Sequence, residues 1–380
     1  RIDTAKHVNF EFWEQWSQQV LDYAHASGKP DFFMFGEVYD ADPAKLSPYV
    51  RDTDMNSVLD FTFQSNAAAY AKGGSAALLQ SLFAGDDMYT TPDSSATALP
   101  TFLGNHDMGR IGYFLGGSGT LERDELAHEL MYLTRGQPVV YYGDEQGFAG
   151  TGGDKDARQS MFATQTAEYA NQPLVTGEQL GSTDRFDTAA PLYTQIAELS
   201  ALRSSHTALR TGAQIERYAD DGPGVYAFSR VDHDEKIEYL VATNNSASEK
   251  TVQIPTLTAD ATFTPLYGAG ASVASGADGA ASVTVPALSA VVFTADRTVS
   301  APAEAGPITV TAPTAGAGLS GLAPVSADVA DSTWAETSFA WRVVGDADWT
   351  PLGTAEDTSP RVYHDVRGLA AGTLIEYRAV

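Results

Sequence analysis

The 380-residue chain contains no cysteine. This absence excludes disulfide bonds, a catalytic thiolate and zinc sites built from cysteine ligands. The chain also lacks an uninterrupted apolar run of the ~18 to 20 residues that a membrane-spanning helix requires. We therefore expect a protein without a membrane span, held together by apolar cores, since 43% of its residues are hydrophobic.

Basic residues are scarce relative to acidic residues. The chain has 23 Lys and Arg residues against 49 Asp and Glu residues, and its formal net charge is −26 at pH 7. Such a charge repels nucleic acids and anionic membrane surfaces. It favours an uncharged or cationic ligand and excludes nucleic acid as a partner, while the composition leaves the oligomeric state open.

The chain also lacks an initiator Met and the charged-then-apolar pattern of a secretory signal peptide. Arg1 already stands inside a strand-like segment. We expect the chain to be a piece of a longer polypeptide.

Strand-like and helix-like segments alternate over residues 1–211. This alternation predicts right-handed βαβ crossovers and a parallel sheet, as in half of an α/β barrel. In the first predicted helix, Trp13 and Trp16 fall on the apolar face and are assigned to the core. After the N-terminal strand, the predicted strands are residues 31–37, 57–63, 98–107 and 137–145, and the main helices are residues 8–30, 65–85, 123–136 and 191–206.

Antiparallel β-structure is expected in the rest of the chain. Residues 212–298 carry short alternating runs that are typical of antiparallel strands. Residues 299–307 are rich in Ala and Pro, which predicts a linker. Residues 308–380 have the strand pattern of an immunoglobulin-like or fibronectin-like sandwich, which we expect to be truncated before its last strand.

Three carboxylates stand at the ends of strand-like segments: Asp3, Glu37 and Asp107. A lone acid after a strand is more often a helix cap or a solvated loop residue. Three in succession, however, lie on one rim of a parallel sheet, where α/β enzymes build their sites. Asp3 and Glu37 are 34 positions apart, about one βαβ repeat, which indicates neighbouring strands. Neighbouring strands can supply the ~5 to 5.5 Å carboxyl separation that retaining cleavage of a glycosidic bond needs.

The segments around these acids resemble those of a known enzyme family. RIDTAKH, FGEVYD and FLGNHD are similar to three successive signature segments of the α-amylase family of glycoside hydrolases, of the family 13 type. LTRGQPVVYYGDEQGF resembles the last barrel strand of the same family, so that the resemblance covers residues 1–296. It implies the C-terminal half of a catalytic (β/α)8 TIM barrel followed by an antiparallel β-sandwich domain. The first barrel strands would then lie upstream, and a five-stranded arc alone would expose an open edge.

The resemblance implies a role for each acid. Asp3 would be the nucleophile that forms a glycosyl-enzyme intermediate, and Arg1 would keep it ionised. Glu37 would protonate the leaving oxygen and then activate water. Asp107 would bind sugar hydroxyls and stabilise the distorted transition state.

The same resemblance implies substrate-binding residues. Asn105 and His106 would face the sugar hydroxyls, and Lys6, His7 and Tyr39 would line the leaving-group side. In the family the backbone carbonyl of the His7 position contacts calcium, so calcium is the one cofactor implied, with most of its ligands upstream and no organic cofactor. For Lys6 and His7 the alternative is that they only begin a helix and touch no ligand.

For three further residues of the barrel half, a structural role is favoured over contact with the substrate. Tyr141 and Tyr142 are assigned to barrel packing rather than to sugar platforms, and Arg158 to a mainly structural role. Three tryptophans of the last unit are candidate starch platforms, with a spacer role for that unit as the default: Trp334, Trp341 and Trp349.

The resemblance implies a secreted hydrolase that cleaves α-1,4-glucosidic bonds in starch-like α-glucans. A pullulanase-type α-1,6 or dual-specificity hydrolase and a transglycosylase remain as alternatives, because they share the three carboxylates. A non-catalytic carbohydrate-binding protein on the same scaffold is disfavoured, because such proteins typically lose a catalytic carboxylate and this chain has all three. The extracellular location and the α-glucan partner follow from the resemblance alone.

Overall fold

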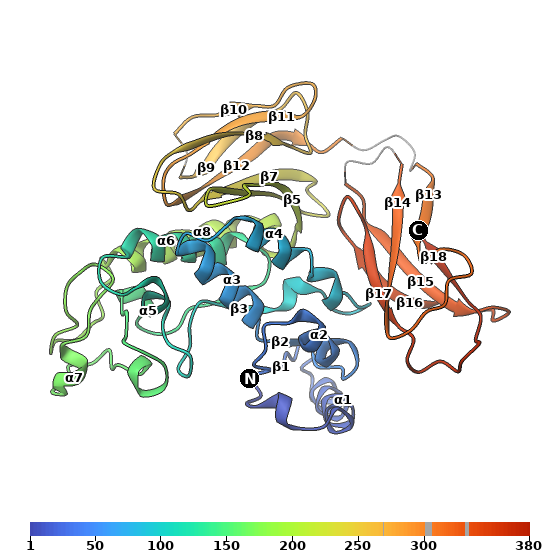
Figure 1. Ribbon diagram of the computed structural model, residues 1–380, viewed down its shortest axis with the longest axis horizontal. Helices are drawn as coiled ribbons and strands as arrows, with labels where there is room; N and C mark the ends of the chain where they lie inside the picture. The colour runs from blue at the N-terminus through green and yellow to red at the C-terminus, as the bar shows by residue number, and fades with distance from the viewer. Residues whose placement is uncertain (269, 301–305, 331–333) are drawn as a thin grey trace.

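A computed structural model describes residues 1–268, 270–300, 306–330 and 334–380. Figure 1 shows three units in chain order: a helix-rich barrel unit, a middle β-unit that lies above its helices, and a C-terminal sandwich beside it. The predicted linker, residues 299–307, lies mostly outside the described residues. No helix in the described ranges is long and apolar enough to cross a membrane.

The barrel unit contains an arc of short parallel strands. Ile2 forms a parallel bridge with Gly36 at one side of the arc. In the middle of the arc, the backbone N–H of Asp60 donates to the carbonyl of Pro100 at 3.0 Å. This bond joins the strand at residues 57–58 to the strand at residues 100–102. This order is one side of a (β/α)8 barrel, as predicted. The strands are β1 (Phe35–Gly36), which pairs with β2 (Ser57–Val58), and β3 (Pro100–Phe102), which pairs with β4 (Gln137–Val139).

Helices surround this arc. The predicted apolar face of the first helix is confirmed: Trp13 and Ala24 are buried, and the Trp13 indole N–H donates to the Ala5 carbonyl at 2.9 Å. Trp16 is half-buried and packs against the same core. The α-helices are α1 (Phe10–Ala26), α2 (Pro43–Arg51), α3 (Phe61–Ala71), α4 (Ala77–Phe83), α5 (Ile111–Leu115), α6 (Leu121–Leu133), α7 (Ala167–Ala170), α8 (Pro191–Ser205) and α9 (Thr207–Thr211). Short 3-10 turns are η1 (Ala5–His7), η2 (Asp86–Tyr89), η3 (Ala96–Ala98), η4 (Asp144–Gln146) and η5 (Asp154–Ala157).

Two local predictions are wrong. The predicted strand 57–63 ends at Val58, because the Asp60 side chain accepts a hydrogen bond from the N–H of Phe63 at 2.8 Å and thereby caps α3. The predicted buried strand 31–37 is reduced to β1, and Phe32 and Phe33 are exposed. An apolar run does not by itself show whether its residues form a buried strand or an exposed segment that leads into a strand.

The middle β-unit is antiparallel, as predicted. Its six-stranded sheet has the order β10-β9-β12-β7-β6-β5, and β11 pairs with β8 in a second sheet. Every residue of β6 is buried because both faces are covered: Tyr226 and Phe228 pack toward the helices, while Val225 and Ala227 pack in a second core with residues of β8 and β11. The strands are β5 (Ala213–Ala219), β6 (Val225–Val231), β7 (Ile237–Asn244), β8 (Lys250–Pro255), β9 (Thr262–Tyr267), β10 (Val273–Ala274), β11 (Ala280–Val285) and β12 (Ser289–Thr298).

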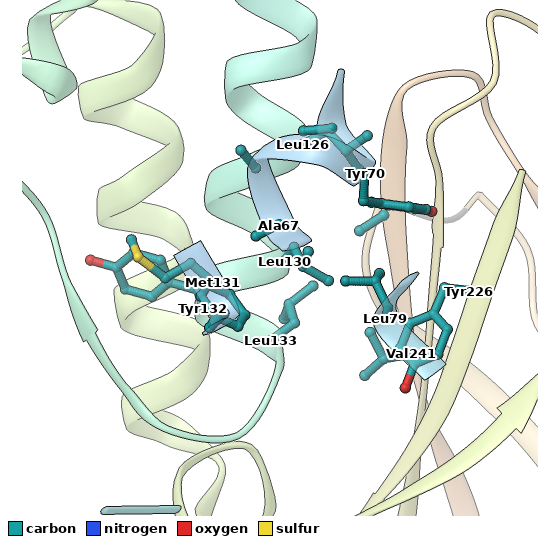
Figure 2. Close-up of a cluster of buried hydrophobic side chains, with 14 of the residues drawn as sticks. Ala67, Tyr70, Leu79, Leu126, Leu130, Met131, Tyr132, Leu133, Tyr226 and Val241 are labelled. Atoms are coloured by element: carbon teal, nitrogen blue, oxygen red, sulfur yellow. The ribbon is translucent and has the colours of Figure 1, made fainter. Parts of the chain in front are cut away.

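One hydrophobic core joins the barrel unit to the middle β-unit. Figure 2 shows residues of α3, α4 and α6 gathered in one cluster with Tyr226 of β6 and Val241 of β7. Tyr70 of α3 also donates its hydroxyl proton to the Gly224 carbonyl at 2.8 Å, so that the buried ring has a polar partner as well. Burial of each large apolar side chain stabilises the fold by about 1.5 to 3 kcal/mol. The labelled residues are Ala67, Tyr70, Leu79, Leu126, Leu130, Met131, Tyr132, Leu133, Tyr226 and Val241.

The C-terminal sandwich consists of two three-stranded antiparallel sheets, in the orders β13-β14-β17 and β16-β15-β18. Val325, Phe339 and Val362 form the centre of its core. The immunoglobulin-like architecture is therefore as predicted. The strands are β13 (Ile308–Ala312), β14 (Leu322–Val329), β15 (Thr337–Val343), β16 (Thr350–Ala355), β17 (Arg361–Asp365) and β18 (Ile375–Ala379).

The three tryptophans of the last unit are all engaged within the chain. Trp341 packs on the sandwich core and against the ring of His364 at 4.3 Å. Trp349 lies against the guanidinium groups of Arg342 and Arg378, at 4.4 and 4.7 Å from the ring centre. Trp334 packs against a buried cluster at the edge of the middle β-unit. A role as starch platforms remains a prediction for these residues.

The C-terminal sandwich is docked on the barrel unit by polar contacts. Arg51 of α2 donates to the carbonyl of Tyr363 in β17 at 2.6 Å. Arg361 pairs with Asp87 at 2.9 Å, although burial still raises the pKa of Asp87 to about 7. Gly353 has φ +134, and a Cβ there would lie 3.0 Å from the carbonyl oxygen of Thr91. The close approach therefore requires glycine.

A buried carboxyl group at the contact between α6 and β9 gives a prediction on pH. Glu129 is 5% exposed, accepts a hydrogen bond from the Tyr267 hydroxyl at 2.8 Å, and has its pKa raised to about 8 by burial. Its pKa in the unfolded chain is about 4.3. Between these values the folded protein holds a proton that the unfolded chain releases, so the free energy of unfolding falls as pH rises. Glu129→Gln removes this ionisable group, so the free energy of unfolding should fall less steeply as pH rises.

The measurement is the thermal unfolding midpoint of the full-length protein at pH 5 and at pH 8.5. We expect the difference between the two midpoints to shrink by several degrees in Glu129→Gln. Glu122→Gln changes an exposed residue of the same helix and should keep the wild-type difference. An equal difference in Glu129→Gln and wild type would contradict the assignment.

Candidate active site

The ends of the first two strands of the arc bring Asp3 and Glu37 together. The N–H of Glu37 donates to the carbonyl of Ile2 at 2.7 Å, and the N–H of Ala5 donates back to the carbonyl of Glu37 at 3.0 Å. Asp3 follows this pairing and its side chain is 67% exposed, whereas that of Glu37 is 13% exposed. One carboxylate therefore faces solvent, while the other is largely enclosed.

Arg1 bridges the two carboxylates. Its Nη1 lies 3.1 Å from Asp3 Oδ1 and its Nη2 lies 2.9 Å from Glu37 Oε2. The N–H of Thr4 lies 3.2 Å from the same Glu37 oxygen. A guanidinium between two carboxylates offsets their mutual repulsion and lets them stay close. The sequence indicated a partner for Asp3 only, and the contact with Glu37 was missed because it depends on strand pairing.

The Asp107 loop follows β3 and folds on itself. Asn105 and Gly109 exchange backbone hydrogen bonds at 3.0 and 3.2 Å. The side-chain oxygen of Asn105 accepts from the N–H groups of Asp107 and Met108 at 2.9 and 2.8 Å. The structure thus gives Asn105 a loop-shaping contact in addition to its predicted place beside the sugar.

Both carboxylate oxygens of Asp107 have partners. His106 Nε2 lies 3.1 Å from Oδ2, and Arg158 Nη2 lies 3.0 Å from Oδ1. Arg158 also donates from Nε to the His106 carbonyl at 3.1 Å and pairs with Asp154 at 2.8 Å. A mainly structural role was expected for Arg158, and the structure adds that this residue touches a predicted site carboxylate. Residue spacing alone does not show that the loop of Arg158 folds back onto Asp107.

Lys6 and Tyr39 lie together beside the Glu37 strand end. Lys6 Nζ donates to the Tyr39 carbonyl at 2.7 Å and lies 5.3 Å from the centre of its ring. The Tyr39 residue is 56% exposed, and its ring rests edge-on against Phe61, which in turn contacts Phe102. An exposed ring with a firm support suits contact with the apolar face of a sugar.

His7 is exposed at the end of η1. The described part of the chain contains no group of three or more His, Asp or Glu side chains that could hold a metal ion. A calcium contact of the His7 backbone carbonyl, with the other ligands upstream, stays a prediction, and no step of the chemistry below depends on a metal.

Arg110 is a buried residue that links three segments around the site. This residue is fully buried and donates to Gln159 Oε1, to the Tyr142 carbonyl and to Asp144 Oδ1, each at 2.7 Å. It thereby connects the Asp107 loop, the end of β4 and the loop of Arg158. The guanidinium also lies 4.5 Å from the centre of the Tyr141 ring, in agreement with a packing role for that tyrosine. Arg110 could not be identified from the sequence, because no local pattern distinguishes a buried arginine.

Comparison with known proteins decides the family. Residues 2–212 match the sequence model of the α-amylase catalytic domain, and residues 217–296 match that of the α-amylase C-terminal all-beta domain. The chain belongs to the α-amylase family. It is 49% identical over 389 aligned residues to an α-amylase of Streptomyces lividans, which covers 100% of this chain and 42% of that protein.

More distant relatives in the α-amylase family are named for other activities. A cyclomaltodextrin glucanotransferase of Klebsiella oxytoca is 24% identical over 67% of this chain and 40% of its own length. A β/α-amylase of Paenibacillus polymyxa is 26% identical over 66% of this chain and 18% of its own length. The chain spans less than half the length of these curated relatives.

Solved structures of α-amylase-type proteins confirm the fold class. The crystal structure of an Anoxybacillus α-amylase superposes with a TM-score of 0.62 at 25% identity, covering 78% of this chain and 58% of that one. A gamma-CGTase from an alkalophilic Bacillus clarkii superposes with a TM-score of 0.61 at 18% identity and covers 99% of this chain and 51% of its own. The second likeness concerns the fold alone and extends over the C-terminal sandwich.

Proposed function

We propose that the protein carrying this chain hydrolyses α-1,4-glucosidic bonds of starch-like α-glucans with retention of configuration. The observation that carries the proposal is Arg1, whose guanidinium touches both Asp3 and Glu37 at neighbouring strand ends. Asp107 supplies a third carboxylate from the same rim of the arc. The α-amylase of Streptomyces lividans, 49% identical over the whole chain, supports the α-1,4 linkage among the alternatives.

The resemblance of RIDTAKH and FGEVYD to signature segments of the family supports the division of roles. The exposed Asp3 attacks the anomeric carbon, and the bond to the leaving oxygen breaks as the enclosed Glu37 gives that oxygen its proton. A covalent glycosyl-enzyme intermediate results. Glu37 then takes a proton from a water molecule, whose oxygen displaces Asp3 from the anomeric carbon.

The surrounding residues bind the sugars. Asp107 and His106 face the hydroxyls of the reacting sugar, and Arg158 holds Asp107 in orientation. Lys6 and Tyr39 form the leaving-group side, with His7 at its exposed margin. These roles rest on the resemblance of RIDTAKH, FGEVYD and FLGNHD to the signature segments of the family.

We also propose a division of the chain into four parts. The element boundaries support it, since α9 ends at Thr211 and β13 begins at Ile308. The parts are the C-terminal half of the catalytic barrel (1–211), the antiparallel β-domain (212–298), a linker (299–307) and the immunoglobulin-like sandwich (308–380).

An extracellular location is part of the proposal. It rests on the resemblance of residues 1–296 to the α-amylase family. The substrate is then the partner, and a non-catalytic binding role is disfavoured by the presence of Asp3, Glu37 and Asp107 in one chain.

The test is incubation of the full-length protein with amylose and, separately, with pullulan. We expect linear malto-oligosaccharides from amylose, released initially in the α-anomeric form, and little cleavage of the α-1,6 bonds of pullulan. Linkage analysis and anomer-resolved NMR would show this. Release of products by α-1,6 cleavage would favour the pullulanase-type alternative, and cyclic products would favour a transglycosylase.

A further inference from the structure

The backbone around Asp107 is hydrogen-bonded through both its N–H and its carbonyl groups. The side-chain oxygen of Asn105 accepts from the N–H of Asp107 at 2.9 Å. The N–H of Asp154 donates to the Asp107 carbonyl at 3.0 Å, and Arg158 Nε donates to the His106 carbonyl at 3.1 Å. The backbone that carries Asp107 is therefore held both by its own loop and by a segment that lies about 50 positions later in the chain.

Gly153 lies directly against this backbone. A Cβ at position 153 would overlap the carbonyl oxygen of Asp107 and would lie 3.1 Å from the carbonyl carbon and oxygen of Met108. All these atoms belong to the backbone, which cannot rotate away as the end of a flexible side chain can. The N–H of Asp154 therefore reaches the Asp107 carbonyl because position 153 carries no side chain.

The turn that follows Gly153 is closed by its own contacts. Asp154 has φ 50, in the left-handed region that aspartate adopts more readily than most residues, and it begins η5. The N–H of Arg158 donates to the carbonyl of Lys155 at 3.3 Å, and Arg158 Nη2 pairs with Asp154 Oδ1 at 2.8 Å. Both hydrogen bonds to the carbonyl groups of the Asp107 loop therefore come from one closed turn.

The same turn orients the Asp107 carboxylate. Arg158 Nη2 lies 3.0 Å from Oδ1, and His106 Nε2 lies 3.1 Å from Oδ2. The Asp107 side chain is 49% exposed, so its orientation depends on these polar partners more than on packing. A misplacement of about 1 Å near a reacting centre can cost a hundredfold in rate. A displacement of the turn would move the Asp107 backbone and its carboxylate together.

We infer that residues 153–158 form a positioning element for Asp107, and that glycine is required at position 153 for this turn to reach the Asp107 backbone. The inference rests on the proposed function, in which Asp107 stabilises the transition state. Gly153 acts through Asp107 rather than on the substrate. A side chain at position 153 displaces the Asp107 carboxylate and leaves Asp3 and Glu37 in place, since these two acids stand on other strands of the arc.

The test begins with Gly153→Ala in the full-length protein. We expect kcat for amylose hydrolysis to fall about thirtyfold, because Asp107 no longer meets the transition state in its correct orientation. KM should change by less than about twofold, since the lost interaction belongs to the transition state. Circular dichroism should show the variant folded.

Gly152→Ala is the matched control in the neighbouring position. The three atoms nearest to a Cβ at Gly152 all belong to the side chain of Asp156, at 3.1 to 3.7 Å, and that side chain can move aside. Its kcat should remain at the wild-type level.

A double-mutant cycle separates positioning from general damage. In an Asp107→Asn background, Gly153→Ala should lower kcat by less than about twofold, because the carboxylate that it displaces is already absent. Arg158→Ala changes only a half-exposed side chain. It should lower kcat about tenfold in the wild-type background, as expected for a lost charged hydrogen bond, and should have little effect in the Asp107→Asn background.

A Gly153→Ala protein with the wild-type kcat, or an equal fall in both backgrounds, would overturn the inference and leave the proposed function intact. If Gly153→Ala does not fold, the cycle with Arg158→Ala decides, and an equal fall in both backgrounds would again overturn the inference. A wild-type protein that does not hydrolyse amylose would overturn the proposed function and this inference with it.

Discussion

Asp3→Asn and Glu37→Gln are each expected to lower kcat for amylose hydrolysis in the full-length protein by at least about a thousandfold. An amide at position 3 cannot displace the leaving group to form the covalent intermediate. An amide at position 37 neither protonates the leaving oxygen nor activates water. Because Arg1 contacts both groups through hydrogen bonds that an amide oxygen can still accept, the fold should persist.

The matched control for these variants is Asp31→Asn. Asp31 is an exposed acid that precedes β1, at the opposite end of the strand from Glu37. Its kcat should remain at the wild-type level, and circular dichroism should show all three variants folded. A Glu37→Gln protein that retains a tenth of the wild-type rate would refute the assignment of the acid.

Replacement of Arg110 by Met should cost about 3 to 5 kcal/mol in the free energy of unfolding at pH 8, as expected for breaking a buried ion pair. The change leaves Gln159, the Tyr142 carbonyl and Asp144 without their donor. Burial already raises the pKa of Asp144 to about 7, so at pH 8 this group must then stay charged without a partner or take up a proton. Denaturant unfolding of the full-length protein measures the loss.

Two further variants make this result interpretable. Arg297→Met removes an exposed ion pair with Asp296 and should leave the unfolding midpoint unchanged. Asp144→Leu added to Arg110→Met removes the stranded carboxyl group and should recover part of the stability. A single Arg110→Met variant as stable as wild type would show that the buried cluster contributes little.

The catalytic rim could be predicted from the sequence because its signals are local. Each of Asp3, Glu37 and Asp107 directly follows a strand pattern, and parallel strands bring their carboxyl ends to one edge. The errors arose where local patterns are ambiguous. The apolar residues around Phe32 and Phe33 predicted a longer buried strand than the structure has. The apolar residues after Val58 predicted a strand where Asp60 instead caps a helix.

The contacts of the site could not be predicted in the same way. Arg158 reaches Asp107 only because its loop folds back, with the N–H of Asp154 donating to the Asp107 carbonyl at 3.0 Å. Arg110 is an unremarkable basic residue in the sequence, and only the fold shows that it is fully buried with three acceptors around it.

The sequence by itself determined the α/β and antiparallel β-architecture, the three carboxylates and, through its signature segments, the α-amylase family. The periodicity of apolar residues and the ends of strands are properties of neighbouring residues, so they can be read without coordinates. The tertiary structure alone decided that Arg1 joins Asp3 to Glu37 and that Arg367 lies in a pocket with Lys6. Ion pairs and cavities depend on how distant segments of the chain pack together, and the local pattern of residues does not predict that packing.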